Sequence, residues 1–125
     1  MEFTFSPEQL SLRKEIRAVF ERLMTPQITS EVAGEAEMGP SYRAFVRSLG
    51  AEGWLGVGWP TEYGGRGFTP IEQAIFFEEA QRAGAPLPLV TLNTVGPTLM
   101  HFGSEEQKRR FLPAILRGDV EFAIG

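Results

Sequence analysis

The sequence predicts an all-α fold, a bundle of about five helices that ends at the start of a β-strand. Hydroxyl residues suited to helix caps recur at Ser6, Thr69 and Ser104, and each is followed three residues later by Gln or Glu. Apolar residues follow these caps at helical spacing, without an internal repeat or low-complexity tract. With 125 residues, 42% of them hydrophobic, the chain can bury one core and form one domain.

The first predicted helix begins after Ser6, because Pro7 suits the first helical position and Gln9 can reach back to the N–H of the cap. One face carries apolar residues at helical spacing, which are Leu12, Ile16, Val19, Phe20 and Leu23. Pro26 interrupts this face, and Thr25 can cap a short continuation of the helix.

The second predicted helix is short and ends at Gly50 or Gly53. Its apolar residues are Tyr42, Phe45, Val46 and Leu49. The third begins with a capping box formed by Thr69 and Glu72. Its apolar residues leave only part of the circumference polar, and they are Ile71, Ala74, Ile75, Phe76, Phe77 and Ala80. We therefore expect the third helix to be mostly buried.

The fourth predicted helix, from about Leu87 to Phe102, is apolar on nearly all sides, and Gly96-Pro97 should bend it. The fifth runs from Ser104 to Arg117, with acidic residues in its first turn, as the helix dipole favours.

The end of the chain predicts a half-buried strand, because apolar residues occupy positions 120, 122 and 124 in alternation. A lone strand leaves its N–H and C=O groups unpaired, so we expect further sequence downstream to pair with it.

Charge and composition exclude several classes of protein. Twelve Lys and Arg against 16 Asp and Glu give a net charge of -4, spread along the chain, which disfavours nucleic acid as a partner and a helix-turn-helix DNA binder as the function. The absence of cysteine excludes disulfides, thiolate catalysis and sulfur-ligated metal. No basic start followed by an apolar stretch and no membrane span of ~20 apolar residues occurs, so we expect a soluble cytoplasmic protein.

A glycine-rich segment, residues 53–68, joins the second and third helices. It holds six glycines, two tryptophans and a tyrosine, which predicts a rigid loop held by buried aromatic rings. A phosphate-binding loop is disfavoured, because no Gly-Lys-Ser/Thr ending follows, no apolar strand precedes it, and Pro60 removes a backbone donor.

Three stretches, in order and at matching intervals, resemble acyl-CoA dehydrogenases. They are Gly53-Trp54-Leu55-Gly56, Pro60-Thr61-Glu62-Tyr63-Gly64-Gly65-Arg66-Gly67, and Phe102-Gly103-Ser104-Glu105-Glu106-Gln107-Lys108 through Phe111-Leu112-Pro113 and Gly118. The resemblance covers the whole chain. It implies an orthogonal helical bundle over residues 1–118, the first of three domains, with residues 119–125 as the first strand of a middle β-domain.

The resemblance also implies a function, an oxidoreductase that uses FAD to remove hydrogens from the α and β carbons of an acyl-CoA thioester in fatty acid metabolism. Relatives usually form tetramers, so a homo- or hetero-oligomer is expected for the complete enzyme. The resemblance places the catalytic base in the C-terminal domain of the family, so no catalytic residue is assigned in this chain. Glu78 and Glu79 are not assigned as the base. We expect this chain alone neither to retain FAD nor to turn over acyl-CoA.

For site residues, the resemblance places the acyl channel at Leu87, Val90, Thr91 and Thr94, with ordinary core packing as the alternative. It places flavin contact at the backbone of Ile124 and Gly125, with an ordinary strand start as the alternative. Fatty acyl and steroid substrates both stay open.

The only histidine, His101, has no acidic or second histidine partner at ligand spacing, so no metal site is predicted. A different class of function also stays open, a non-catalytic helical interaction module or a flavin-free subunit of a heteromeric dehydrogenase-like complex.

Overall fold

The computed structural model describes residues 4–33 and 39–122. These residues form six α-helices, namely α1 (Pro7–Leu23), α2 (Pro26–Ala33), α3 (Pro40–Ala51), α4 (Pro70–Ala83), α5 (Gly96–Phe102) and α6 (Glu105–Leu116). A 3-10 turn, η1 (Thr61–Tyr63), lies between α3 and α4, and a π-helical turn, η2 (Thr91–Val95), leads directly into α5. The prediction of an all-α bundle is confirmed.

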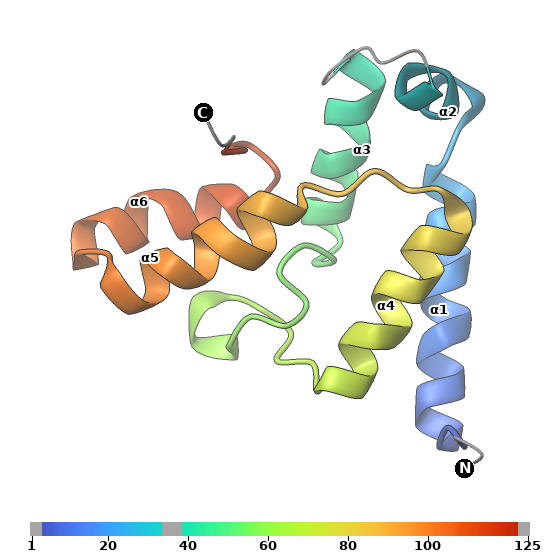
Figure 1. Ribbon diagram of the computed structural model, residues 1–125, viewed down its shortest axis with the longest axis horizontal. Coiled ribbons are helices and arrows are strands. Elements are labelled where there is room, and N and C mark those ends of the chain that lie inside the picture. Colours follow the sequence, from blue (N-terminus) through green and yellow to red (C-terminus); the bar gives the residue numbers. More distant parts are fainter. Residues whose placement is uncertain (1–3, 34–38, 123–125) are drawn as a thin grey trace.

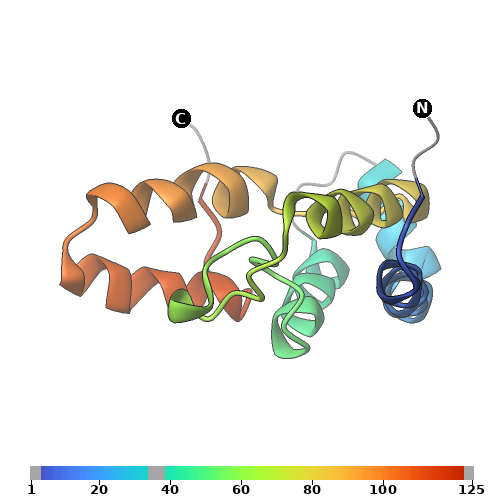
Figure 2. The ribbon, with the colours of Figure 1, turned by 90° about the horizontal axis from the view of Figure 1, so that it is seen from below.

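The helices pack in pairs. α1 lies along α4, α5 runs back along α6, and the short α2 lies against α3 (Figure 1). The α5–α6 pair runs across the direction of the α1–α4 pair, with α3 between them, and the view turned by 90° agrees (Figures 1 and 2). The crossing pairs enclose the core, and the end of α6 comes close to α3 and to the start of the η2–α5 helix.

The predicted helix starts at residues 6, 69 and 104 are all present, each as a reciprocal capping box. At Ser6, for example, the hydroxyl oxygen accepts from the N–H of Gln9 at 3.1 Å, and the Gln9 side chain accepts from the N–H of Ser6 at 2.9 Å. α3 begins differently, because its cap, Gly39, has no side chain. The Glu31 carboxylate of α2 accepts from the N–H groups of Ser41 at 3.2 Å and Tyr42 at 3.0 Å, so a neighbouring helix caps α3.

Aromatic rings join the helices at the centre of the core. The ring of Phe20 in α1 lies 5.5 Å from that of Phe76 in α4 and 6.5 Å from that of Phe45 in α3. Trp54, in the glycine-rich segment, stacks on Phe76 at 6.2 Å. These rings are buried, so the glycine-rich segment is part of the core, as the sequence predicts.

The fourth predicted helix differs from the expectation in its first turns. Residues 85–88 are not helical, since Pro86 and Pro88 disfavour the helical conformation in the residues before them. The helical path then begins at Leu89 and passes through η2 before it becomes α-helical at Gly96.

The strand expected at the end of the chain is not formed at residues 120–122, since the described part of the chain contains no second strand to pair with it. Residues 123–125 lie outside the described residues. Over the ranges that the structure describes, none of the helices combines the length and the apolar character needed to cross a membrane.

Candidate functional site

The helix that runs from η2 into α5 carries the predicted channel residues and departs from regular geometry. The Gly96 N–H donates to the carbonyl of Thr91, five residues earlier, instead of to the carbonyl four residues earlier. Pro97 follows and has no N–H, so this turn lacks one donor. The Leu92 carbonyl accepts instead from Nε1 of the Trp59 indole at 2.9 Å, in a buried hydrogen bond.

Trp59 reaches this carbonyl because glycine leaves room for its ring. A Cβ atom at Gly96 would lie 2.2 Å from Cζ2 of Trp59, and a Cβ at Gly65 would lie 2.2 Å from the Trp59 carbonyl oxygen. Trp59 as a whole is 4% exposed. The glycine-rich segment therefore holds the η2–α5 helix on its buried side, through the Trp59 indole, which contacts the helix backbone.

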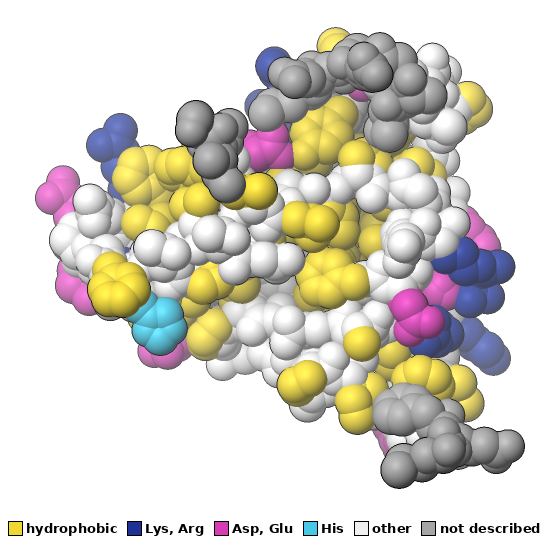
Figure 3. Space-filling model, in the orientation of Figure 1, with side chains coloured by type: hydrophobic (Ala, Val, Ile, Leu, Met, Phe, Trp, Pro, Cys, Tyr) yellow, Lys and Arg dark blue, Asp and Glu magenta, His cyan; other side chains and the backbone are white. Residues whose placement is uncertain are grey.

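The four predicted channel residues lie in three different environments. Leu87 is partly buried against the core, and Thr91 is 1% exposed. Val90 is 38% exposed and Thr94 is also exposed, at positions four residues apart on the same helix. Leu89, 46% exposed, adds apolar surface beside them. Hydrophobic side chains gather on the middle of the face shown in Figure 3, whereas lysines and arginines lie mainly toward its edges.

The Thr91 hydroxyl is occupied by the chain that leaves α6. It accepts from the Phe122 N–H at 2.8 Å and lies 3.3 Å from the Phe122 carbonyl, to which it can donate. The Phe122 ring packs edge-on against Phe111 of α6 at 5.6 Å. The end of the described chain is therefore attached to the same helix that presents Val90 and Thr94.

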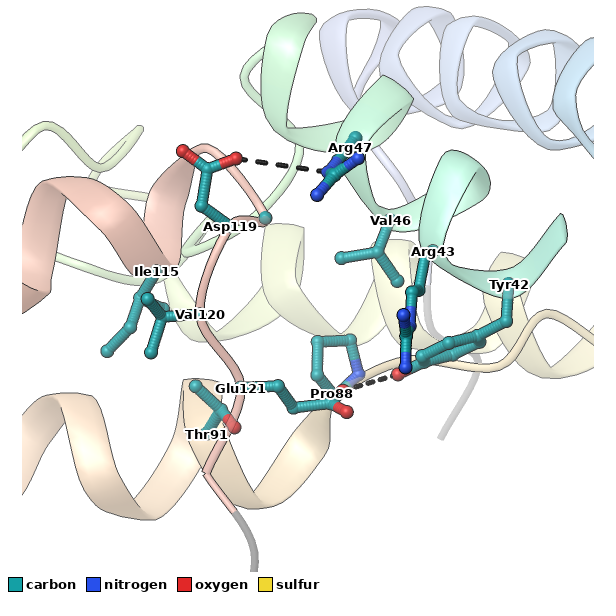
Figure 4. A pocket seen from close by; sticks show the side chains of 11 residues that line it. Tyr42, Arg43, Val46, Arg47, Pro88, Thr91, Ile115, Asp119, Val120 and Glu121 are labelled. Atoms are coloured by element: carbon teal, nitrogen blue, oxygen red, sulfur yellow. Dashed lines mark hydrogen bonds and ion pairs between the residues drawn. The ribbon is translucent and has the colours of Figure 1, made fainter. Parts of the chain in front are cut away.

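A cavity of about 250 Å³ lies beside this attachment, between α3, the residues that follow α6 and the start of η2 (Figure 4). Its polar side chains include the hydroxyl of Tyr42, which donates to the Glu121 carboxylate at 2.5 Å, and Asp119, which lies 3.9 Å from Arg47. Burial raises the pKa of Tyr42, and the hydrogen bond to Glu121 raises it further. This phenol stays protonated at neutral pH and serves as a hydrogen-bond donor.

The buried acid Glu79 lies on the other side of the bundle, between α1 and α4. Arg17 binds its carboxylate from Nε at 2.8 Å and from Nη2 at 2.5 Å, and nitrogens of Arg13 and Arg82 lie 3.7 and 3.8 Å away. The hydrogen bond from Arg17 holds the pKa of Glu79 below its usual value, although burial opposes this. A carboxylate so stabilised is a poor proton acceptor, which disfavours Glu79 as a general base.

Two hollows in the described part of the chain lack the pattern of a dinucleotide-binding site. Besides the cavity above, an open hollow of about 530 Å³ lies beside Tyr63 and Lys108 and carries side chains of both signs. Neither hollow follows the strand–glycine turn–helix arrangement that holds a dinucleotide pyrophosphate. The predicted flavin contacts, Ile124 and Gly125, lie outside the described residues. Across residues 4–33 and 39–122, no group of three or more metal-binding side chains is found.

Two contacts in this region escape sequence reasoning. The indole of Trp59 and the backbone of Phe122 bind residues 33 and 31 positions away in the chain. Helical periodicity carries no information on contacts at such separation. The one local signal was Pro97, whose missing N–H indicates that a nearby carbonyl needs another donor.

Comparison with known proteins gives a consistent result. The family model described as acyl-CoA dehydrogenase, N-terminal domain, matches residues 6–119. Acyl-CoA dehydrogenase FadE29 of Mycobacterium tuberculosis is 57% identical over 120 residues, which cover 96% of this chain and 31% of that protein. Acyl-CoA dehydrogenase FadE26 of the same organism is 48% identical over 128 residues, with 100% of this chain and 32% of that protein covered.

Solved structures agree. The ChsE4–ChsE5 complex from Mycobacterium tuberculosis superposes with a TM-score of 0.90 at 46% identity and covers 100% of this chain and 32% of the matched one. The Tcur3481–Tcur3483 steroid ACAD gives a TM-score of 0.86 at 50% identity, covering 100% and 33%. The chain thus spans about a third of the length of the relatives that it matches.

Proposed function

The chain belongs to the acyl-CoA dehydrogenase family, as its N-terminal domain, and we propose that it forms the helical wall of an acyl channel in an FAD-dependent dehydrogenase of acyl-CoA thioesters. In this proposal, residues 1–118 are the helical domain, and residues 119–125 lead into a middle β-domain. FAD supplies the hydride acceptor when it is bound in the complete enzyme, at a site formed mainly by other domains.

The single observation that supports a wall is the exposed Val90–Thr94 face on a helix that is held from behind. An acyl chain needs apolar contact on one side and exclusion of water, and a rigid helix provides both. Trp59 and Phe122 hold this helix on its buried side, so Val90 and Thr94 are free to face a ligand. Leu87 packs against the core, whereas Thr91 is buried behind the wall.

A steroid-derived acyl thioester is the substrate class that we propose. One similar structure is titled a steroid ACAD and shares 50% identity over the whole of this chain. Val90 and Thr94 are small enough to leave space above the helix for a wide, rigid ring system, whereas aromatic residues at these positions would fill it.

The test uses a chimera in which residues 1–125 replace the corresponding third of FadE26, a relative aligned over the whole of this chain. We expect the chimera to bind flavin and to reduce an electron-accepting dye with a steroid side-chain acyl-CoA. Purified chimera that holds flavin yet oxidises neither this substrate nor a straight-chain acyl-CoA would contradict the proposed function.

The wall itself is tested by Val90→Phe in the chimera. The larger ring should lower kcat/KM for the steroid thioester by about fivefold to a hundredfold, as the ~1–3 kcal/mol cost of filling a fitted apolar space predicts, with a smaller effect on a straight chain. Ile71→Phe is the matched control, because Ile71 is also 38% exposed but lies at the start of α4. Equal effects of the two substitutions would remove Val90 from the channel.

A second candidate function is a subunit of an assembly of two different chains. The two similar structures contain the paired proteins ChsE4–ChsE5 and Tcur3481–Tcur3483, so a heteromer is the form of oligomer that we propose. Whether such a subunit holds flavin is decided by the residues encoded after Gly125. The family resemblance implies that the flavin-contacting segment continues from Ile124 and Gly125 into a Thr-Glu-Pro-containing turn. Such a continuation favours a flavin-binding subunit, and an unrelated continuation favours a flavin-free one.

A further inference from the structure

We propose that Thr91 is a positioning residue that fixes the start of the next segment against the acyl wall. This inference rests on the proposed function for its consequence in catalysis, but the attachment itself is independent of any ligand. The hydroxyl of Thr91 makes both of its hydrogen bonds to one residue, Phe122, with 2.8 Å to the backbone nitrogen and 3.3 Å to the carbonyl oxygen.

This use of a threonine differs from the ordinary one in a helix. A helical threonine usually bonds a carbonyl of its own preceding turn, as Thr98 does by donating to the Thr94 carbonyl at 2.7 Å. Thr91 is 1% exposed and instead satisfies a backbone N–H from a segment 31 residues away. One side chain thus replaces the strand partner that the Phe122 backbone otherwise lacks in the described part of the chain.

The segment approaches Thr91 along a path that is fixed at several points. α6 ends with a left-handed Gly118 (φ 77°), where the Gly118 N–H donates to the Ile115 carbonyl at 3.0 Å and the Asp119 N–H to the Ala114 carbonyl at 3.0 Å. Asp119 then pairs with Arg117 at 2.9 Å.

The hydrogen bond between Tyr42 and Glu121 follows along the same segment, and the Phe122 ring packs on Phe111 (Figure 4 shows the Tyr42 contact). The last fixed point is the pair of hydrogen bonds between Thr91 and Phe122.

The consequence is a fixed spacing between the proposed acyl wall and Phe122. Val90 precedes Thr91 directly and faces outward, and Ile124, where the family resemblance places flavin contact, follows Phe122 by two residues. Since one hydroxyl joins the two segments, loss of this hydroxyl should let the later segment shift relative to the acyl wall. Reaction rates depend steeply on such positioning, because a reacting geometry tolerates displacements of only a fraction of an ångström.

The first test measures amide hydrogen exchange of Phe122 by NMR in the 125-residue chain. Thr91→Val keeps the shape of the side chain and removes the hydroxyl, and Thr91→Ser keeps the hydroxyl. We expect the Phe122 amide to exchange about tenfold faster in Thr91→Val than in the unaltered chain, as loss of one buried hydrogen bond predicts, and Thr91→Ser to restore protection. Thr98→Val is the matched control and should leave Phe122 unchanged.

Equal exchange of Phe122 in the Val and Ser variants overturns the attachment. Exchange that rises equally at core amides such as that of Ile75 shows general destabilisation and also overturns it. Neither outcome involves acyl-CoA, so neither bears on the proposed function.

The second test places the same variants in the chimera with FadE26. Thr91→Val should lower kcat at least tenfold with KM changed less than threefold, and Thr91→Ser should recover most of kcat, because the hydroxyl and not the methyl group holds the segment. An active chimera in which Thr91→Val leaves kcat unchanged overturns the positioning role. An inactive unaltered chimera contradicts the proposed function instead.

Discussion

The contact between Trp59 and the η2–α5 helix gives the sharpest test of how this fold is held together. The indole N–H donates to the Leu92 carbonyl at 2.9 Å, and its ring occupies the space that a side chain at Gly96 would need. Trp59→Phe removes the donor and leaves a buried carbonyl without a partner, which costs about 1–3 kcal/mol of unfolding free energy. The smaller ring leaves a gap that adds to this loss.

Gly96→Ala perturbs the same contact from the other side. The backbone at Gly96 is right-handed helical (φ -56°, ψ -56°), so alanine is allowed there and even gains about 1 kcal/mol of helix propensity. The added Cβ would nevertheless lie 2.2 Å from Cζ2, 2.9 Å from Cε2 and 2.8 Å from Cη2 of the Trp59 ring. We expect overpacking to dominate, with a net loss of about 1–2 kcal/mol.

The two substitutions should not be additive. Phenylalanine at position 59 has a single ring and lacks the part of the indole that carries Cζ2. The clash with the new methyl group is therefore largely removed. The double variant should therefore be more stable than the sum of the single effects predicts, by about 1 kcal/mol or more. Urea unfolding followed by far-ultraviolet circular dichroism measures all four proteins, and equal slopes against urea make their free energies comparable.

Trp54→Phe is the matched control for this cycle. Trp54 is 3% exposed, close to the 4% of Trp59, and it stacks on Phe76 and under the guanidinium of Arg66. Its indole N–H has no hydrogen-bond acceptor in the part of the chain that the structure describes. The losses of unfolding free energy caused by Trp54→Phe and by Gly96→Ala should therefore be additive. If the unfolding free energies of Trp59→Phe and Gly96→Ala were also additive within ~0.5 kcal/mol, the reasoning would be refuted.

Two further predictions concern charge and backbone shape. The Glu79 pKa lies below its ordinary 4.5, mainly through the Arg17 hydrogen bond, so its stabilising contribution is complete above the pKa of Glu in the unfolded chain and is lost as the pH falls through the lower folded pKa. Glu79→Gln should flatten the decline of unfolding free energy in that acidic range, and an unaltered acid profile contradicts this. Gly118→Ala and Gly84→Ala both strain a left-handed residue, at φ 77° and 68°, but only at 118 would the new Cβ meet a backbone oxygen, that of Val46 at 2.9 Å. Thermal unfolding should show a larger loss at 118 than the ~1 kcal/mol expected at 84, and equal losses argue against the steric reason.

Local sequence signals determine much of this fold, and they succeed where the cause is local. Each capping box joins residues three positions apart, so Ser6, Thr69 and Ser104 could be assigned as helix starts by spacing alone. The start of α3 had no such signal, because Glu31 caps it from a different helix. The burial of Trp54 and Trp59 followed from composition, whereas the carbonyl that Trp59 binds did not.

Two of the predicted channel residues, Thr91 and Thr94, differ in burial, and the π turn supplies the physical reason. In a regular α-helix each residue turns about 100°, so residues three apart, such as Thr91 and Thr94, share a face. A hydrogen bond over five residues requires more residues in each turn, so each residue turns less. Thr94 therefore does not return to the face of Thr91, and the structure buries one and exposes the other.

This separation gives two threonines with different tasks on one short helix. A regular helix through residues 91–95 would place Thr91 and Thr94 near one face and would not separate a buried threonine from an exposed one. Because Pro97 withholds a donor and Trp59 supplies one, the π turn is retained, and the helix can attach a later segment on one side while it presents Val90 and Thr94 on the other. The glycine at position 96, required by the Trp59 ring, is thereby linked to the position of Phe122. We accordingly expect Gly96→Ala to raise the exchange rate of the Phe122 amide, although the two residues do not touch, and unchanged exchange in that variant would show that the two attachments are independent.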